Sequence, residues 1–230
     1  MNKGIIKKIY RVKDIENIQT KLNQLGYDKK FDAVTFLTIR ILTTLLLALI
    51  LFAFYYSKYI IIPFIIIIYY YLFYYIFITI PLNKRIKRLD KDALEYFEVL
   101  TLSLESGKNL ENSLELTCYN IDNELSREFK KCLIETKFGK SLMESLNDLK
   151  KRIPSETVNN IILNMTQTSV FGSSIIDTMN TQVDYLREKQ IMEIKAEINK
   201  IPNKVSIISV LFIVPLILLI ILGPFIIGLF

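Results

Sequence analysis

One apolar stretch decides the fold class of this chain: VSIISVLFIVPLILLIILGPFIIGLF, which covers residues 205–230. It contains no charged side chain, and 20 of its residues are Val, Ile, Leu or Phe. Such residues favour membrane insertion by roughly 0.3–0.6 kcal/mol each, so the whole stretch prefers the membrane by about 6–12 kcal/mol. A helix rising about 1.5 Å per residue crosses a hydrocarbon core of about 30 Å at this length. The stretch therefore predicts a transmembrane helix.

Two further apolar runs, over residues 36–56 and 59–82, also have the length of membrane spans. Only Ser57 and Lys58 separate them, which predicts a tight helical hairpin. Arg40 is the one charge inside a span, and we expect its long side chain to reach back to the lipid headgroups. The second run is rich in tyrosine, which indicates either an interfacial aromatic belt with helix packing or a groove for another transmembrane helix. These tyrosines are Tyr69, Tyr70, Tyr71, Tyr74 and Tyr75.

The distribution of basic residues predicts the orientation of the spans. Residues 1–32 contain eight Lys or Arg, the hairpin tip contains only Lys58, and no charge follows Lys204. A basic cluster follows the second span and is interpreted as a topological anchor: Lys84, Arg85, Lys87, Arg88 and Lys91. By the positive-inside rule, the N-terminus and the middle of the chain are cytoplasmic and the C-terminus lies outside. We expect no processing, because the first apolar run begins too late for a secretory signal.

Four parts follow from this topology, in a multi-pass protein of the inner (cytoplasmic) membrane. Residues 1–33 form a basic amphipathic N-terminal helix, and residues 34–82 form a two-span hairpin. Residues 83–204 form a cytoplasmic helical domain, and residues 205–230 form the last span. The domain is charge-balanced, with 19 basic and 19 acidic side chains, so the net charge of +6 comes from elsewhere. A basic arm beside a membrane is typical of contact with anionic lipid, not with nucleic acid.

The N-terminal arm carries apolar residues at helical spacing. They are Ile5, Ile9, Val12, Ile15, Ile18, Leu22 and Leu25. This pattern predicts a helix that ends at Gly26 and lies either on the inner leaflet or on the cytoplasmic domain. A hydrophobic stripe alone does not name its partner.

The middle of the chain, residues 83–204, shows helical periodicity and no strand signal. Three similar turns recur in it: SGKNLENSL around Gly107, FGKSLMESL around Gly139 and FGSSIIDTM around Gly172. Glycine can adopt the left-handed conformation that ends a helix, and Ser141 with Glu144 fits a capping box. The spacing of 32 and 33 residues also suits a solenoid, but no known repeat signature is present and short turns favour antiparallel neighbours. We expect an all-α fold with three transmembrane helices and an antiparallel bundle of about six helices.

Residues for common catalytic chemistry are scarce. The chain has no histidine, which removes the commonest general base and metal ligand. Cys118 and Cys132 are interpreted as buried small apolar residues. The sequence GKS at residues 139–141 lacks the upstream glycine and the strand of a phosphate-binding loop. Acidic side chains alternate with basic ones, as on solvated helix faces. We therefore expect no catalytic residue, no cofactor and no metal, and so no enzyme activity.

The middle and the tail resemble a known family. The stretches ESGKNLENSLEL and KFGKSLMESLNDLKKRIP are similar to its glycine turns and following helices, and Gln167 followed by Gly172 is similar to its Gln-to-Gly turn. Charged positions before the last span and a proline-bearing tail extend the similarity: Asp184, Arg187, Glu197, Lys200, Lys204, Pro215, Gly223 and Pro224. Over residues from about 90 to 230 the chain thus resembles the type II secretion system F domain. A single copy of the domain makes the platform proteins of the Tad (Flp) pilus the closest likeness.

The resemblance implies a non-enzymatic inner-membrane platform of a type IV or Tad-like pilus or of a type II secretion machine. Its implied partners are a cytoplasmic ATPase, pilin or pseudopilin subunits, membrane lipids, and a second platform subunit or further copies of the same chain. The polar faces beside the glycine turns, with Glu105, Lys108 and Lys140, are the candidate ATPase contact. The long helix over residues 175–201 is expected to carry motion to the last span, unless Pro202 breaks it. The alternative function is a small membrane receptor or regulator that recruits a cytosolic partner.

Overall fold

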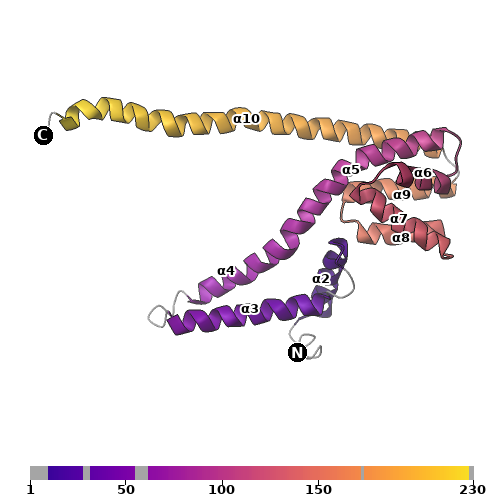
Figure 1. Ribbon diagram of the computed structural model, residues 1–230, viewed down its shortest axis with the longest axis horizontal. Coiled ribbons are helices and arrows are strands. Elements are labelled where there is room, and N and C mark those ends of the chain that lie inside the picture. Colours follow the sequence, from indigo (N-terminus) through magenta and orange to yellow (C-terminus); the bar gives the residue numbers. More distant parts are fainter. Residues whose placement is uncertain (1–9, 28–31, 55–61, 172–173, 228–230) are drawn as a thin grey trace. The chain divides into compact units, whose positions relative to one another are not determined.

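The computed structural model describes residues 10–27, 32–54, 62–171 and 174–227 (Figure 1). The described residues are almost entirely helical and contain no strand, as expected for an all-α protein. The helices are α2 (Val12–Gln24), α3 (Ala33–Phe54), α4 (Ile62–Tyr74), α5 (Ile80–Glu105), α6 (Leu110–Asn120), α7 (Glu124–Lys137), α8 (Leu142–Arg152), α9 (Glu156–Phe171) and α10 (Ile175–Ile227). The chain forms two compact units, Met1–Gln182 and Val183–Phe230, and each is described by itself.

Among the described residues, three helices are long and apolar enough to cross a membrane, in agreement with the three predicted spans. The first lies in α3, the second begins with α4, and the third lies in α10. The hairpin tip with Ser57 and Lys58 lies outside the described residues.

The second span does not end before the helical domain begins. A five-residue π-helical turn, Tyr75–Thr79, joins α4 to α5, and the helix is continuous from Ile62 to Glu105. Pro81 stands just after this turn; it lacks an N–H, and in a regular helix its ring clashes with the carbonyl four residues earlier. The wider π turn accommodates this disruption without breaking the helix. The expected boundary after residue 82 is thus not marked by any break in secondary structure.

Residues 83–204 are covered by α5, α6, α7, α8, α9 and the first part of α10, in agreement with the expected six helices. Short turns reverse the chain between successive members of the α5–α9 group (Figure 1). The core is aromatic: Tyr96 stacks on Phe129 with ring centroids 4.6 Å apart, and Phe97 meets Phe129 edge-on at 6.2 Å. These contacts place α7 alongside α5. The apolar stripes of α5 and α9 are buried, including Ala93, Leu100, Val158, Ile161, Ile162 and Met165.

The N-terminal helix α2 packs on the transmembrane hairpin. Its buried residues Ile18 and Leu22 join a hydrophobic cluster with Phe36 and Leu37 of α3 and Phe73 of α4. The sequence leaves lipid and the cytoplasmic domain as alternative partners for the apolar face of α2. In the structure, that face packs mainly against the base of the hairpin. The helix also contacts α8 of the bundle. It ends as expected at Gly26, which has a φ of 78°.

The expectation for Arg40 is wrong. Its side chain does not reach toward headgroups but is buried between α3 and α4, with 6% of the residue exposed. Its guanidinium lies 3.5 Å from the centroid of the Tyr70 ring and donates a 2.8 Å hydrogen bond to the Tyr70 carbonyl oxygen. Cation–π and hydrogen-bond contacts therefore hold this charge inside the hairpin. Tyr70 also pairs with Tyr10 across 2.5 Å, and Tyr74 accepts a hydrogen bond from Lys21, so these two tyrosines serve intramolecular packing.

Candidate functional site

Two of the three predicted glycine turns are described, and both have the expected conformation. Gly107 has a φ of 85° and Gly139 a φ of 96°, in the left-handed region that favours glycine. In each turn the glycine N–H bonds back to a carbonyl of the preceding helix, Leu104 or Thr136, at 2.9 Å. The turns thus end α5 and α7 as predicted. Gly172 lies outside the described residues.

A polar cap follows each of these turns and begins the next helix. The side chain of Asn109 accepts a 2.8 Å hydrogen bond from the Asn112 backbone at the start of α6. Ser141 and Glu144 form the predicted capping box at the start of α8, with hydrogen bonds of 3.2 and 3.3 Å. The recurring sequence pattern therefore encodes a recurring helix–turn–helix geometry.

The glycine turns lie at the end of the bundle far from the hairpin. α5 continues from the second span, so its last residue, Glu105, is its farthest point from that span. α7 runs in the same direction as α5, because Arg85 pairs with Glu124 near the start of both helices and Tyr96 stacks on Phe129 farther along. Gly107 and Gly139 consequently share one end, and Lys108 and Lys137 beside them line one groove.

The three candidate ATPase-contact residues differ in the exposure and the ion pairing of their side chains. Lys108 is exposed in the turn after α5. Glu105 is exposed too and accepts a 3.1 Å hydrogen bond from the Asn180 side chain. Lys140 is held by two carboxylates, at 3.0 Å from Glu135 and in a short contact with Asp148. Lys108 and Glu105 are thus available at the surface, whereas Lys140 helps to hold α7 and α8 together.

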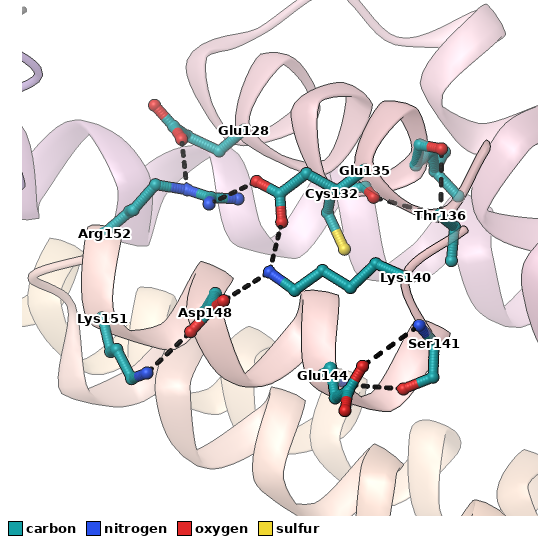
Figure 2. A network of polar contacts seen from close by, with 11 residues as sticks. Glu128, Cys132, Glu135, Thr136, Lys140, Ser141, Glu144, Asp148, Lys151 and Arg152 are labelled. Atoms are coloured by element: carbon teal, nitrogen blue, oxygen red, sulfur yellow. Dashed lines mark hydrogen bonds and ion pairs between the residues drawn. The ribbon is translucent and has the colours of Figure 1, made fainter. Parts of the chain in front are cut away.

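Lys140 belongs to a network of ion pairs between α7 and α8 (Figure 2). Arg152 pairs with Glu135 at 2.7 Å and lies 3.7 Å from Glu128. Asp148 binds both Lys140 and Lys151, the latter at 2.7 Å. Charges from both helices alternate along their shared edge, so the network stabilises their antiparallel packing.

The pKa values of this network favour the charged forms. Hydrogen bonds from Lys140 and Lys151 lower the pKa of Asp148 to about 2. Burial acts to raise the pKa of Glu135, but Lys140 and Arg152 outweigh it, so the net pKa is lowered. Hydrogen bonds to Asp148 and Glu135 raise the pKa of Lys140 in turn. Asp148, Glu135 and Lys140 are therefore ionised at neutral pH.

A second ion-pair cluster lies at the end of the bundle nearest the hairpin. Arg85 is buried, donates at 2.7 Å to Glu124 and at 2.9 Å to Glu128, and also donates to the Gln24 carbonyl oxygen. The side chains of Arg85 and Glu128 are each less than a tenth exposed, so their ion pair is buried. The role of the basic cluster after the second span as a topological anchor stays a prediction. The sequence contains one signal that Arg85 is buried. It stands one helical turn before Leu89, on the same buried face of α5.

An open groove runs between α6 and α7, beside the glycine turns. Its apolar part includes Leu116, Tyr119 and Ile134, and its rim carries Lys108 and Lys130. Tyr119 is 87% exposed. Phe138, in the turn itself, is 88% exposed. Large apolar side chains exposed beside lysines are typical of protein-binding surfaces. The groove could not be predicted from the sequence, because neither helix alone shows that two exposed apolar faces meet.

The family-like positions lie along α9 and α10. Gln167 is exposed on α9, and Arg187 pairs with Asp184 at 3.4 Å on α10. Glu197 and Lys200 are exposed on α10. The remaining positions, Lys204, Pro215, Gly223 and Pro224, all lie within the helical span of α10. The helix also passes through Pro202, so proline does not break it.

Both cysteines are free and buried, which confirms their interpretation as small apolar residues. Burial raises the pKa of Cys132 to about 11 and raises that of Cys118 as well. Neither is a thiolate nucleophile at neutral pH. In the described part of the chain, Cys, Asp and Glu side chains form no group that could hold a metal ion.

These features define a class: a membrane protein whose described residues are almost entirely helical, with three span-length helices and a helical bundle that continues from the second of them. The model of the family "type II secretion system (T2SS), protein F" matches residues 96–223, more than half of the chain. The chain therefore belongs to that family. The family and the three apolar helices indicate a multi-pass platform protein of the inner membrane in a secretion or pilus system. No curated protein and no solved structure gives a significant match.

Proposed function

We propose that this protein is a platform of a type IV or Tad-like pilus, or of a type II secretion machine. It couples a cytoplasmic ATPase to the movement of pilin or pseudopilin subunits through the membrane, and it performs no catalysis itself. The observation that carries the proposal is helix continuity: the helix Ile62–Glu105 and α10 each join an apolar, span-length segment to charged helical segments without a loop. A continuous helix transmits displacement between its ends, whereas a flexible loop absorbs it.

The ATPase is proposed to bind the glycine-turn end of the bundle. This end lies far from the hairpin, where a bulky cytosolic partner meets no steric obstacle from the bilayer. Lys108 and Glu105 are the contact residues, and the α6–α7 groove provides apolar surface beside them. Lys140 acts through its ion pairs with Glu135 and Asp148, which fix the second turn.

Charge reversal tests this contact. Full-length protein carrying Glu105→Lys and Lys108→Glu should retain less than a tenth of the ATPase that the wild-type chain retains in a pull-down from membranes. Opposite charges placed at an interface remove attraction and add repulsion. The matched control is Arg127→Glu, because Arg127 is also exposed but stands near the start of α7, at the other end of the bundle. Unchanged retention in the double variant would place the ATPase contact elsewhere.

A second function, a receptor or regulator that recruits a cytosolic partner, draws support from the exposed groove with Tyr119 and Ile134. The two functions differ in what a deletion strain loses. Loss of surface filaments or of secretion supports the platform. Normal filaments and normal secretion with an altered response to a signal support the regulator.

A further inference from the structure

The ion pairs between α7 and α8 include one contact that is not closed. Arg152, the last residue of α8, donates from Nη1 to Glu135 at 2.7 Å. Its Nε lies 3.7 Å from Oε2 of Glu128, which is too long for a hydrogen bond. Among the described residues, neither this Nε nor this Oε2 has a hydrogen-bond partner, although both atoms are buried. Figure 2 shows the guanidinium of Arg152 reaching toward both carboxylates.

The other oxygen of Glu128 is occupied. Its Oε1 accepts hydrogen bonds from Arg85 at 2.9 Å and from Lys131 at 3.0 Å. Arg85 also donates to Glu124 and to the Gln24 carbonyl oxygen. The side of the cluster that faces α5 is therefore complete, whereas the side that faces α8 is open. Buried charged groups without hydrogen bonds are unfavourable, so a small movement of α8 that closes this side is favourable.

We propose that Arg152 is a latch with two positions: bound to Glu135, as in this structure, or bound to Glu128. These two carboxylates stand seven residues apart on α7, which places them on one face of the helix, about 10 Å from each other along its axis. A shift of less than about 1 Å at the end of α8 shortens the open contact to a hydrogen bond. Packed helices change between discrete arrangements by shifts of this size.

The latch determines what the end of α8 is attached to. In the second position, Arg152 binds the carboxylate that also holds Arg85, and Arg85 lies on the continuous helix Ile62–Glu105 that begins with the second span. In the first position, Arg152 binds Glu135, which has no ion pair with that helix among the described residues. The bundle is thus connected to the membrane helix more firmly when the latch is on Glu128.

Glu135 relates the latch to the second glycine turn. Lys140, the residue after Gly139, also binds Glu135, at 3.0 Å. A partner that draws Lys140 away from Glu135 leaves this carboxylate to Arg152 and so holds the latch in its first position. Binding at the glycine-turn end therefore changes a contact at the hairpin end of the bundle. This regulatory role rests on the proposed ATPase contact, whereas the two positions of Arg152 do not.

Two single variants separate a latch from a static ion pair, because both remove the same contact between Arg152 and Glu135. If the contact is static, Glu135→Gln and Arg152→Gln both loosen the end of α8. If Arg152 is a latch, Glu135→Gln releases it to Glu128 and fastens that end, whereas Arg152→Gln loosens it. The readout is amide hydrogen exchange of the last turn of α8, where the Ile153 N–H donates to the Leu149 carbonyl oxygen at 3.0 Å.

In the full-length, detergent-solubilised chain, exchange of this turn should slow at least threefold in Glu135→Gln and quicken at least threefold in Arg152→Gln. Adding Glu128→Gln to Glu135→Gln should remove the gained protection, because the second position then lacks its carboxylate. The matched control is Lys151→Gln, which replaces the neighbouring exposed cation and should change exchange less than twofold.

Three outcomes would overturn the latch. The first is unchanged or faster exchange in Glu135→Gln, which is the result of a static ion pair. The second is unchanged or slower exchange in Arg152→Gln. The third is protection in Glu135→Gln that persists when Glu128 is also replaced, since Glu128 would then not be the second site. The measurement contains no ATPase, so the latch and the proposed ATPase contact fail independently.

Discussion

At the scale of single residues, buried charges determine how the bundle attaches to its membrane helix. Glu128 is the centre of this arrangement, with Arg85 at 2.9 Å, Lys131 at 3.0 Å and Arg152 at 3.7 Å. Because Arg85 lies on the helix that continues from the second span, this cluster connects that helix to α7 and α8. Arg85 also binds the end of α2, so three parts of the chain meet at one guanidinium.

Replacement of Glu128 by Ala should destabilise the protein by about 3 kcal/mol. Removing one partner of a buried ion pair leaves an uncompensated charge, which costs about 3–5 kcal/mol, and Glu124 still pairs with Arg85 here. Denaturant unfolding of the detergent-solubilised chain measures the loss. The exposed pair Asp122–Arg127 provides the control, since Asp122→Ala should change stability by less than about 0.5 kcal/mol. A loss below about 1 kcal/mol in the Glu128 variant would contradict the assigned role of the cluster.

The ion pairs beside Lys140 predict how stability depends on pH. The folded-state pKa of Asp148 falls from its usual 3.8 to about 2, and that of Glu135 is also lowered, so both carboxylates bind protons more weakly when folded. Their stabilising contribution is fully present above the ordinary pKa values and is lost as pH falls through the lowered ones. The melting temperature should therefore drop between about pH 5 and pH 2. Asp148→Asn should flatten this drop; an unchanged profile would contradict the assignment.

At the scale of helices, local signals were predictable and long-range ones were not. The turns at Gly107 and Gly139 and the capping box at Ser141 depend on residues within a few positions of each other, so their patterns are visible in the sequence. The burial of Arg40 depends on Tyr70, thirty positions away, and that of Arg85 on residues on two other helices. A rule based on nearby hydropathy places both arginines at the membrane surface, because it does not include these partners.

The unbroken helix α10 carries an element-scale prediction for the proposed function. Ala196 is an exposed position of α10 before the apolar segment. α10 already accommodates Pro202, and a second proline shortly before it removes a further backbone hydrogen bond at a local cost of about 3 kcal/mol, which kinks the helix. Ala196→Pro should abolish filament assembly or secretion while leaving the protein level and ATPase binding within twofold of wild type. Ala196→Ser is the matched control and should retain function. Full function of the proline variant would exclude α10 as a rigid connection.

At the scale of the whole molecule, the proposed function depends on one arrangement of the chain across the membrane. Basic residues stand before the first span and after the second, which predicts that these ends lie in the cytoplasm, and the ATPase contact requires the bundle to lie on that same side. With three spans, the same prediction puts the C-terminus on the opposite side.

Paired reporters can test this arrangement directly. A reporter that is active only outside the cytoplasm should work when fused after Phe230 and fail when inserted at Asp122, in the exposed turn between α6 and α7. A reporter active only in the cytoplasm should give the reverse pattern, with at least a tenfold difference between sites. The physical reason is the insertion cost of roughly 2.5–3.5 kcal/mol per Lys or Arg, which keeps the basic segments from crossing the membrane. Cytoplasmic activity at Phe230, or external activity at Asp122, would invert the topology and place the glycine-turn end out of reach of any cytoplasmic ATPase.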